Sequence, residues 1–264
     1  MRLRVDLASG RLERQIYLAG FPHGIAIDER RGLYLVATSG EPQVVAIDRQ
    51  HLRIKKTVRM PGPVDALVLD VKRDRIYADE DNGQRIWVLD PDLRVVVTIA
   101  TPQDSDKVEY DLHTDRLYQN FTTIDSTLVI DPARNEILAR WSTLPARRPH
   151  GLAIDRTRGV LYVAGANGWL VATDVVTGRL LASVRIAPNV DQIALDAKRR
   201  RLYCASGDGY ISVLDVSRRE PTLLANITVP HGAHTLAVDP SSGDVWISYG
   251  TERDDYIMRL VPRE

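Results

Sequence analysis

The stretch Phe21-Pro-His-Gly-Ile-Ala-Ile-Asp28 opens a pattern that the chain repeats along its length. Gly32-Leu-Tyr-Leu-Val-Ala-Thr-Ser39 and Val44-Val-Ala-Ile-Asp48 follow it, and each is a short apolar, β-branched run bounded by turn-forming residues. Such runs predict β-strands, because β-branched side chains suit a pleated sheet and turn formers end the run. A further run from Ile54 to Val58 completes a predicted unit of four strands.

Two features recur at a fixed distance and align six copies of this unit. A hydrophobic residue followed by Asp recurs at spacings of 42, 41, 44, 41 and 43 residues, with the aspartates at Asp28, Asp70, Asp111, Asp155, Asp196 and Asp239. An aromatic residue follows six or seven residues later, at Tyr34, Tyr77, Tyr118, Tyr162, Tyr203 and Trp246. A period in the low forties with four short strands is typical of β-propeller blades. No sustained helical periodicity is present, so we expect very little helix.

The repeat therefore predicts an all-β fold, a six-bladed β-propeller of four-stranded antiparallel blades, in a single domain over residues 1–264. The predicted blades cover approximately residues 21–60, 61–101, 102–144, 145–187, 188–229 and 230–264. The last copy holds only three strands, whereas the N-terminal segment 2–19 resembles an outer strand. We expect that segment to join the C-terminal blade, because closure removes exposed sheet edges. Both ends carry a run that resembles a third strand, and the sequence does not decide which is used.

Composition excludes several classes of protein. The 264 residues include 35 basic and 35 acidic side chains, and a formal net charge of zero argues against nucleic-acid or membrane binding driven by charge. The basic run Lys198-Arg-Arg-Arg201 takes the place of the turn Asp28 to Arg31, so we interpret it as a solvated turn. The single cysteine, Cys204, lies in a predicted strand and is expected to be a packed thiol.

The chain has no apolar stretch of membrane-spanning length and no signal-like segment at its start. As given, it is expected to be soluble and cytoplasmic, or secreted or periplasmic if a leader has been removed. We also expect a monomer.

One column of the repeat concentrates potential metal ligands. The position five residues before the recurring Asp holds His23, Asp65, Asp106, His150, Asp191 and His234. This position begins the innermost strand of each blade, so the six residues are predicted to form a ring at the mouth of the central channel. We expect the three imidazoles to ligate one ion, with each free ring N–H held by a carboxylate of a neighbouring blade. The predicted pairs join His23 with Asp65, His150 with Asp106 or Asp191, and His234 with Asp191.

The expected cofactor is a divalent transition metal ion, with Zn, Fe, Ni, Cu and Mn not distinguished, because all of them accept imidazole. Calcium fits less well, since it prefers oxygen ligands. Three carboxylates roughly 8 Å apart repel by about 2 kcal/mol per pair at an effective dielectric constant near 20, so the ring needs positive charge. Two alternatives without metal remain open: His–Asp ion pairs, or side chains that only hydrogen-bond the turns before the inner strands. The uniform Asp column at the end of these strands is interpreted as a turn device.

Three further residues are candidate acids or bases near the same mouth. Glu80 belongs to the polar run Asp79-Glu80-Asp81-Asn82, where other copies have small or apolar residues. Glu109 stands in a column of alanines, and an ion pair with Lys107 is the alternative explanation. His231 lies in the loop before His234, where a histidine often has no catalytic role.

Two tryptophans lie near the candidate loops. Trp169 could face a ligand, whereas Trp87 is expected to pack within its blade.

The three runs from Phe21 to Asp48 resemble the YVTN-type propeller repeat, also called YncE-like, and more distantly the NHL and streptogramin-lyase propellers. The resemblance covers essentially the whole chain and implies the fold more strongly than the function. Such families include sugar-lactone hydrolases, a metal-dependent antibiotic lyase and many propellers that only bind partners. Well-known YVTN-like and streptogramin-lyase members have seven blades, where this chain has six copies. No catalytic His and Glu pair of the lyase type can be carried over.

Three functions follow as hypotheses. The first is a metal-binding propeller that acts as a hydrolase or lyase on a small molecule, by lactone opening or elimination. The second is a non-enzymatic scaffold for a protein or ligand, with structural His–Asp pairs. The third is a metal-free pocket for a small ligand.

Overall fold

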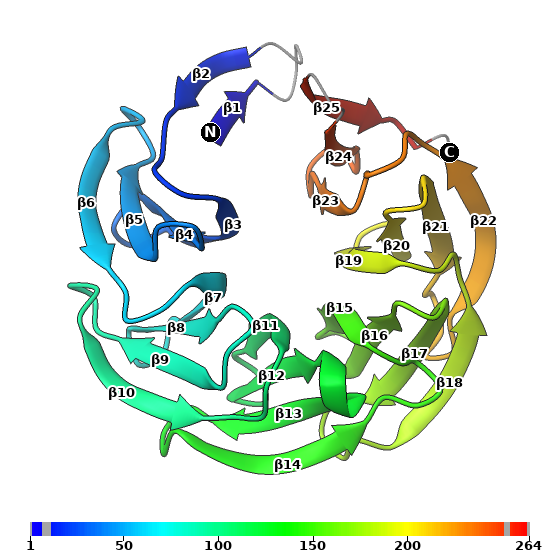
Figure 1. Cartoon of the computed structure of the whole chain (residues 1–264). Coiled ribbons are helices and arrows are strands. Elements are labelled where there is room, and N and C mark those ends of the chain that lie inside the picture. The colour runs from blue at the N-terminus through cyan, green and yellow to red at the C-terminus, as the bar shows by residue number, and fades with distance from the viewer. Residues whose placement is uncertain (1, 7–11, 251–253, 263–264) are drawn as a thin grey trace. The chain divides into compact units, whose positions relative to one another are not determined.

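The computed structural model describes residues 2–6, 12–250 and 254–262. Their strands form six consecutive antiparallel sheets, which makes the fold a six-bladed β-propeller (Figure 1). The predicted fold class is confirmed. The only helix among the described residues is the three-residue 3-10 helix η1 (Thr122–Ile124), as expected from the absence of helical periodicity.

The first three sheets each contain four strands in chain order. The first has β3 (Pro22–Asp28), β4 (Leu33–Thr38), β5 (Gln43–Asp48) and β6 (Ile54–Arg59). The second has β7 (Val64–Asp70), β8 (Arg75–Glu80), β9 (Arg85–Leu89) and β10 (Val95–Ala100). The third has β11 (Ser105–Asp111), β12 (Arg116–Phe121), β13 (Ser126–Asp131) and β14 (Glu136–Ser142).

The remaining sheets follow the same order. The fourth has β15 (Pro149–Asp155), β16 (Val160–Gly165), β17 (Trp169–Asp174) and β18 (Leu180–Arg185). The fifth has β19 (Val190–Asp196), β20 (Arg201–Ser206), β21 (Tyr210–Asp215) and β22 (Thr222–Thr228). The sixth has three strands, β23 (Thr235–Val238), β24 (Val245–Gly250) and β25 (Asp255–Leu260).

The N-terminal segment forms a hairpin that the sequence does not predict. Within the described residues, β1 (Arg2–Val5) pairs antiparallel with β2 (Leu12–Ile16), so the two form a separate two-stranded sheet. Ile16 and Leu18 pack against the buried residues Val36 and Val45 of the first blade. The addition of this segment to the last blade stays a prediction. Residues 7–11, within the predicted segment, lie outside the described residues.

The chain divides into two compact units. Unit 1 comprises Met1–Leu117 and Ile130–Ile137, and unit 2 comprises Tyr118–Val129 and Leu138–Glu264. In unit 1 the inner strands β3, β7 and β11 lie side by side, and in unit 2 the strands β15, β19 and β23 do the same. Each unit thus brings the first residues of three inner strands together.

Apolar residues between adjacent sheets form the core of each unit. In unit 1, Trp87 is 2% exposed and packs with Leu35 and Val64, which confirms its predicted role in blade packing. In unit 2, Tyr162 and Leu170 pack with Cys204. Cys204 is fully buried, and burial raises the pKa of its thiol far above the usual value. The prediction of a packed thiol is confirmed, because an uncharged, buried thiol is a poor nucleophile.

The aspartate that ends each inner strand forms the following turn. Its carboxylate accepts backbone N–H groups two or three residues later, for example from Arg31 to Asp28 at 3.0 Å and from Thr157 to Asp155 at 3.0 Å. The six aspartates that do this are Asp28, Asp70, Asp111, Asp155, Asp196 and Asp239. The fourth residue after each one has a left-handed backbone, at Gly32, Asp74, Asp115, Gly159, Arg200 and Gly243. The Asp column is therefore a turn device, as predicted.

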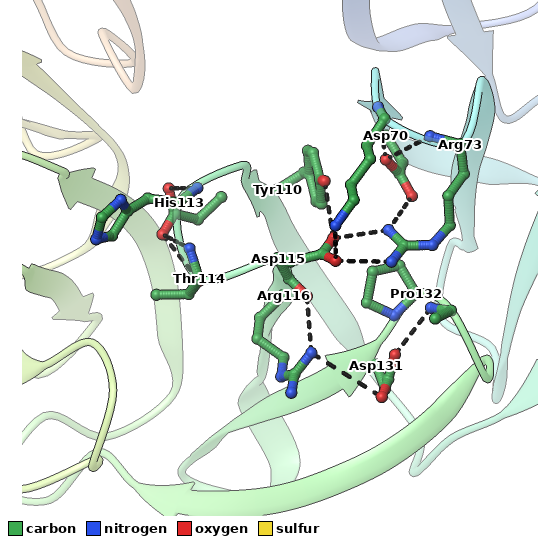
Figure 2. A network of polar contacts seen from close by, with 12 residues as sticks. Asp70, Arg73, Tyr110, His113, Thr114, Asp115, Arg116, Asp131 and Pro132 are labelled. Carbon is green, nitrogen blue, oxygen red and sulfur yellow. Dashed lines mark hydrogen bonds and ion pairs between the residues drawn. The ribbon is translucent and has the colours of Figure 1, made fainter.

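An arginine extends this turn to the next blade of unit 1. Arg73 donates to the buried Asp70 at 2.9 Å and holds both carboxylate oxygens of Asp115 at 2.7 Å (Figure 2). Arg31 makes the equivalent contacts with Asp28 and Asp74. The Arg73 guanidinium lowers the pKa of Asp115 far below its usual value. Bidentate Arg–carboxylate pairs of this kind fix both distance and direction between neighbouring turns.

The first three residues of the basic run Lys198–Arg201 lie exposed in the turn between β19 and β20, as predicted, and Arg201 begins β20. None of the described residues belongs to a helix of the length and apolar character that crossing a membrane requires.

We expect Arg73→Gln to lower the free energy of unfolding by about 1–3 kcal/mol, since it removes the charged partner of an Asp70 side chain that is 0% exposed. Urea unfolding measures the change. The matched control is Arg94→Gln, because Arg94 and Asp92 form a 3.9 Å pair with side chains 76% and 67% exposed, which should contribute less than about 0.5 kcal/mol. Equal losses in both variants would contradict the prediction.

Candidate functional site

Four of the six predicted ring residues lie at β-bulges. The pairing of the inner strand with its neighbour shifts register between Pro22 and Ile25 in β3 and between Val64 and Leu67 in β7. The same shift occurs between Pro149 and Gly151 in β15 and between Val190 and Gln192 in β19. The bulged positions hold His23, Asp65, His150 and Asp191. A bulge bends the strand and redirects a side chain, and bulges are frequent beside functional sites.

In unit 1, His23 and Asp65 form the pair that the sequence predicts. Nδ1 of His23 lies 3.1 Å from Oδ1 of Asp65, and Nε2 lies 2.8 Å from the hydroxyl of Ser39. The two side chains are 37% and 30% exposed. Both ring nitrogens of His23 therefore have protein partners, so metal binding through this ring requires one contact to be exchanged.

Beside this pair lies a buried carboxyl group that the sequence analysis did not select. Asp79 is 0% exposed, accepts the amide N–H of Ala66 at 2.5 Å and accepts the hydroxyl of Ser105 at 3.0 Å. Burial raises the pKa of Asp79 well above its usual value, and the negative charges of Asp65 and Asp106 raise it further. Both effects disfavour the ionised form of Asp79, which lies next to the ring carboxylates of unit 1.

In unit 2, Asp191 contacts two imidazoles. Its Oδ1 lies 3.9 Å from Nδ1 of His150, and its Oδ2 lies 2.7 Å from Nδ1 of His234. The side chains of His150, Asp191 and His234 are 22%, 38% and 53% exposed. The hydrogen bond from Asp191 raises the pKa of His234, because it favours the charged imidazolium.

These contacts confirm the predicted pairs of His23 with Asp65, His150 with Asp191 and His234 with Asp191. Ligand atoms of His150 and Asp191 lie within 4.8 Å of one another, a spacing at which both could hold one ion. His234 uses Nδ1 for Asp191, which makes Nε2 its available metal-binding nitrogen. The convergence of all three imidazoles stays a prediction, since His23 belongs to unit 1 and the other two belong to unit 2.

The other candidates have different surroundings. Glu80 accepts the amide of Gln84 at 3.0 Å and pairs with Arg85 at 3.0 Å, so its carboxylate is engaged within the turn between β8 and β9. Glu109 lies 3.9 Å from Lys107, the ion pair named as the alternative to a catalytic role. His231 is exposed in the loop between β22 and β23. The catalytic roles of Glu80, Glu109 and His231 stay predictions.

Ring residue Asp106 belongs to unit 1, and its carboxylate accepts the amide of Lys107 at 2.7 Å.

Trp169 carries the guanidinium of Arg185 over its ring, 4.1 Å from the centroid. A cation therefore already covers one face of this indole.

A signal for the buried polar residues is present in the sequence. The fifth residue of the second strand is alanine in three of the first five sheets, and the five residues are Ala37, Asp79, Asn120, Ala164 and Ala205. A buried polar side chain in a column of alanines requires a hydrogen-bond partner. The polar run around Glu80 includes Asp79, which strand alternation places beside the ring residues of unit 1. Glu80 is the last residue of β8, and its carboxylate contacts the turn that follows.

Comparisons with solved structures agree with the fold. The chain is similar to a chain of the hydrazine synthase of Kuenenia stuttgartiensis, with a TM-score of 0.82 and 14% identity over 98% of this chain and 89% of that chain. It is also similar to a chain of a mitotic checkpoint complex, with a TM-score of 0.80 and 12% identity over 98% of this chain and 81% of that chain. Identities this low support the fold alone. No protein-family model and no curated protein sequence matches the chain.

The Asp191–His234 contact predicts a pH-dependent stability in metal-chelated protein. The raised pKa of His234 means that the contact stabilises the fold fully below the unfolded pKa of about 6.5, and that this contribution is lost as pH rises through the folded pKa. The loss of stability in Asp191→Asn should therefore be larger at about pH 5.5 than at about pH 8.5. Urea unfolding measures the loss, and an NMR titration should show a lower His234 midpoint in the variant. An unchanged midpoint would contradict the assignment.

The buried carboxyl group of Asp79 predicts a second pH dependence of the stability against unfolding. A carboxyl group with a raised folded pKa loses stability as pH rises from its unfolded pKa to its folded pKa. Asp79→Asn cannot ionise, so its stability relative to the parent chain should increase as pH rises above about 4. Thermal unfolding across pH measures this difference. Asp81 offers a matched control as Asp81→Asn, because its pKa is also raised but it is only half-buried, so its effect should be smaller.

Proposed function

We propose that this propeller binds a divalent transition metal ion on unit 2, through His150 and Asp191 together with His234. The observation that carries the proposal is the shared carboxylate of Asp191, which lies 3.9 Å from one imidazole and 2.7 Å from another. Two imidazoles and one carboxylate suit Zn, Fe, Ni, Cu and Mn. A bound ion would balance the negative charge of the Asp191 carboxylate.

The exposure of the three side chains favours an open site. His150 is the least exposed at 22% and His234 the most exposed at 53%, so a bound ion would keep a face toward solvent. A metal with an open coordination position can polarise a carbonyl group or activate a water molecule, which is the chemistry of lactone hydrolysis or elimination on a small molecule. The support for the ring residues Asp106, His23 and Asp65 as further ligands is their equivalent position in the sequence repeat. The YVTN-type resemblance likewise rests on the repeat residues and supports a propeller of this general class.

The contacts of His23 favour a second function, a non-enzymatic scaffold with structural His–Asp pairs. Its two ring nitrogens contact Asp65 and Ser39, so the pair in unit 1 is complete without an ion. A scaffold of this kind would recognise its protein or small-molecule partner through the propeller surface. Chelation separates the two functions, because removing a bound metal lowers the melting temperature by mass action and leaves a metal-free pair unaffected.

Metal analysis of protein purified without chelator tests the proposal. We expect about one transition-metal ion per chain, and we expect His150→Ala and Asp191→Ala to lose it, because each removes one ligand. Titration of the chelated protein with Co²⁺ gives a second measurement, since its absorption spectrum reports the ligand geometry. Asp106→Ala and His23→Ala test separately whether the ring column extends the site.

His51→Ala is the matched control. His51 also contacts an aspartate, Asp48, at 3.0 Å, but it lies in the turn between β5 and β6 and is 64% exposed. This variant should keep the metal content of the parent chain. The proposal is wrong if chelator-free protein contains no stoichiometric metal and binds no Co²⁺, or if His51→Ala and His150→Ala lose metal equally.

A further inference from the structure

Asn120 is a buried amide at a position where three of the first five sheets have alanine. It is the fifth residue of β12, and its counterparts Ala37, Ala164 and Ala205 are as deeply buried. Transfer of an amide from water to the interior costs free energy unless hydrogen bonds replace those with water. The amide of Asn120 therefore needs hydrogen-bond partners nearby, whereas the alanines at the equivalent positions do not.

The compensation comes from the bulge that carries His150. Nδ2 of Asn120 donates to the backbone carbonyl of His150 at 3.0 Å and to that of Gly151 at 3.2 Å. Oδ1 accepts the hydroxyl of Thr127 at 2.6 Å. Asn120, Thr127, His150 and Gly151 all belong to unit 2. Both N–H groups and the oxygen of the amide are thus used, which fixes its orientation.

The two accepting carbonyls belong to the bulged residue of β15, His150, and to the residue that follows it, Gly151. The register of β15 with β16 shifts between Pro149 and Gly151, so the strand ladder is interrupted at His150. Backbone groups released from the ladder need other partners, and here one amide holds both. Holding these carbonyls restrains the direction of the Cα–Cβ bond of His150, and so limits the positions that its imidazole can reach.

Unit 1 shows the same device with a different residue. Asp79, the equivalent of Asn120 in β8, accepts the N–H of Ala66, which follows the ring residue Asp65 in the bulge of β7. In both cases the polar residue in the alanine column contacts the backbone of a bulge that carries a ring side chain.

We infer that Asn120 is a positioning residue that holds the His150 bulge in the geometry needed for metal binding. This role rests on the proposed metal site. Groups behind a metal ligand orient it, and their removal typically lowers metal affinity 10–100-fold. Asn120 acts through the backbone of His150 and need not touch the ion.

The test uses the full chain and two readouts. The first is Co²⁺ affinity by titration of chelated protein, where Asn120→Ala should weaken binding by about 10–100-fold. The second is independent of metal: NMR signals of the His150 ring and amide hydrogen exchange at Gly151, both of which should change in Asn120→Ala. Should Asn120→Ala fail to fold, Asn120→Ser replaces it, because its shorter side chain cannot reach both carbonyls.

Two controls separate positioning from general loss of stability. Tyr118→Phe removes a buried hydrogen bond from the same strand, the 2.7 Å contact with the carbonyl of Val175, and should lower the melting temperature without changing Co²⁺ affinity. Thr127→Val keeps the two contacts to β15 and should bind Co²⁺ nearly as the parent chain does.

The outcomes distinguish this inference from the metal site itself. If the parent chain binds no metal but the His150 signals still change in Asn120→Ala, the proposed function fails and the positioning of His150 stands. If Asn120→Ala keeps both the Co²⁺ affinity and the His150 signals of the parent chain, the positioning role is overturned.

Discussion

The carboxylate that ends each inner strand is the constraint on which the blades depend. It lies at the end of the strand, accepts the amides of the turn and so fixes where the second strand begins. In the first two blades an arginine of the turn also holds this carboxylate and an aspartate of the next turn. The same charged side chains therefore fix both the strand register within a sheet and the spacing between neighbouring sheets. A strand whose last residue is fixed in this way can accommodate an irregularity only near its first residue.

That irregularity is the β-bulge, and in four inner strands the bulged position holds a polar ring residue. A regular strand would place its first side chains in strict alternation between the two apolar faces of the blade. One extra residue breaks the alternation, and the side chains of His23, Asp65, His150 and Asp191 are 22–38% exposed. The bulge also leaves backbone groups that need partners, which explains why buried polar residues, Asp79 and Asn120, lie directly beside it. The partly exposed ring residues and the buried polar residues beside them therefore have the same origin, which is the β-bulge.

The repeat predicted the fold and the pairing of the ring residues, because both follow from a period that is visible in the sequence. The strand limits, the turn aspartates and the His–Asp neighbours all lie at constant offsets within each copy. The bulges were not predicted, since a register shift leaves the apolar pattern almost unchanged. The choice between Asp79 and Glu80 depended on strand alternation, which the adjacent acidic residues obscured. The N-terminal hairpin was not predicted, because a strand-like segment can pair with its own neighbour as readily as with a distant edge.

A three-blade period lies within the six-blade repeat. The third residue after the turn aspartate is arginine in the first, second, fourth and fifth blades, but Thr114 in the third and Ser242 in the sixth. The ring follows the same division, with His, Asp, Asp in one half and His, Asp, His in the other. The two halves of the chain therefore share one pattern of turn residues. The ring position at which the halves differ, Asp106 in one and His234 in the other, gives the second half its additional imidazole, so similar turns accompany different donor atoms.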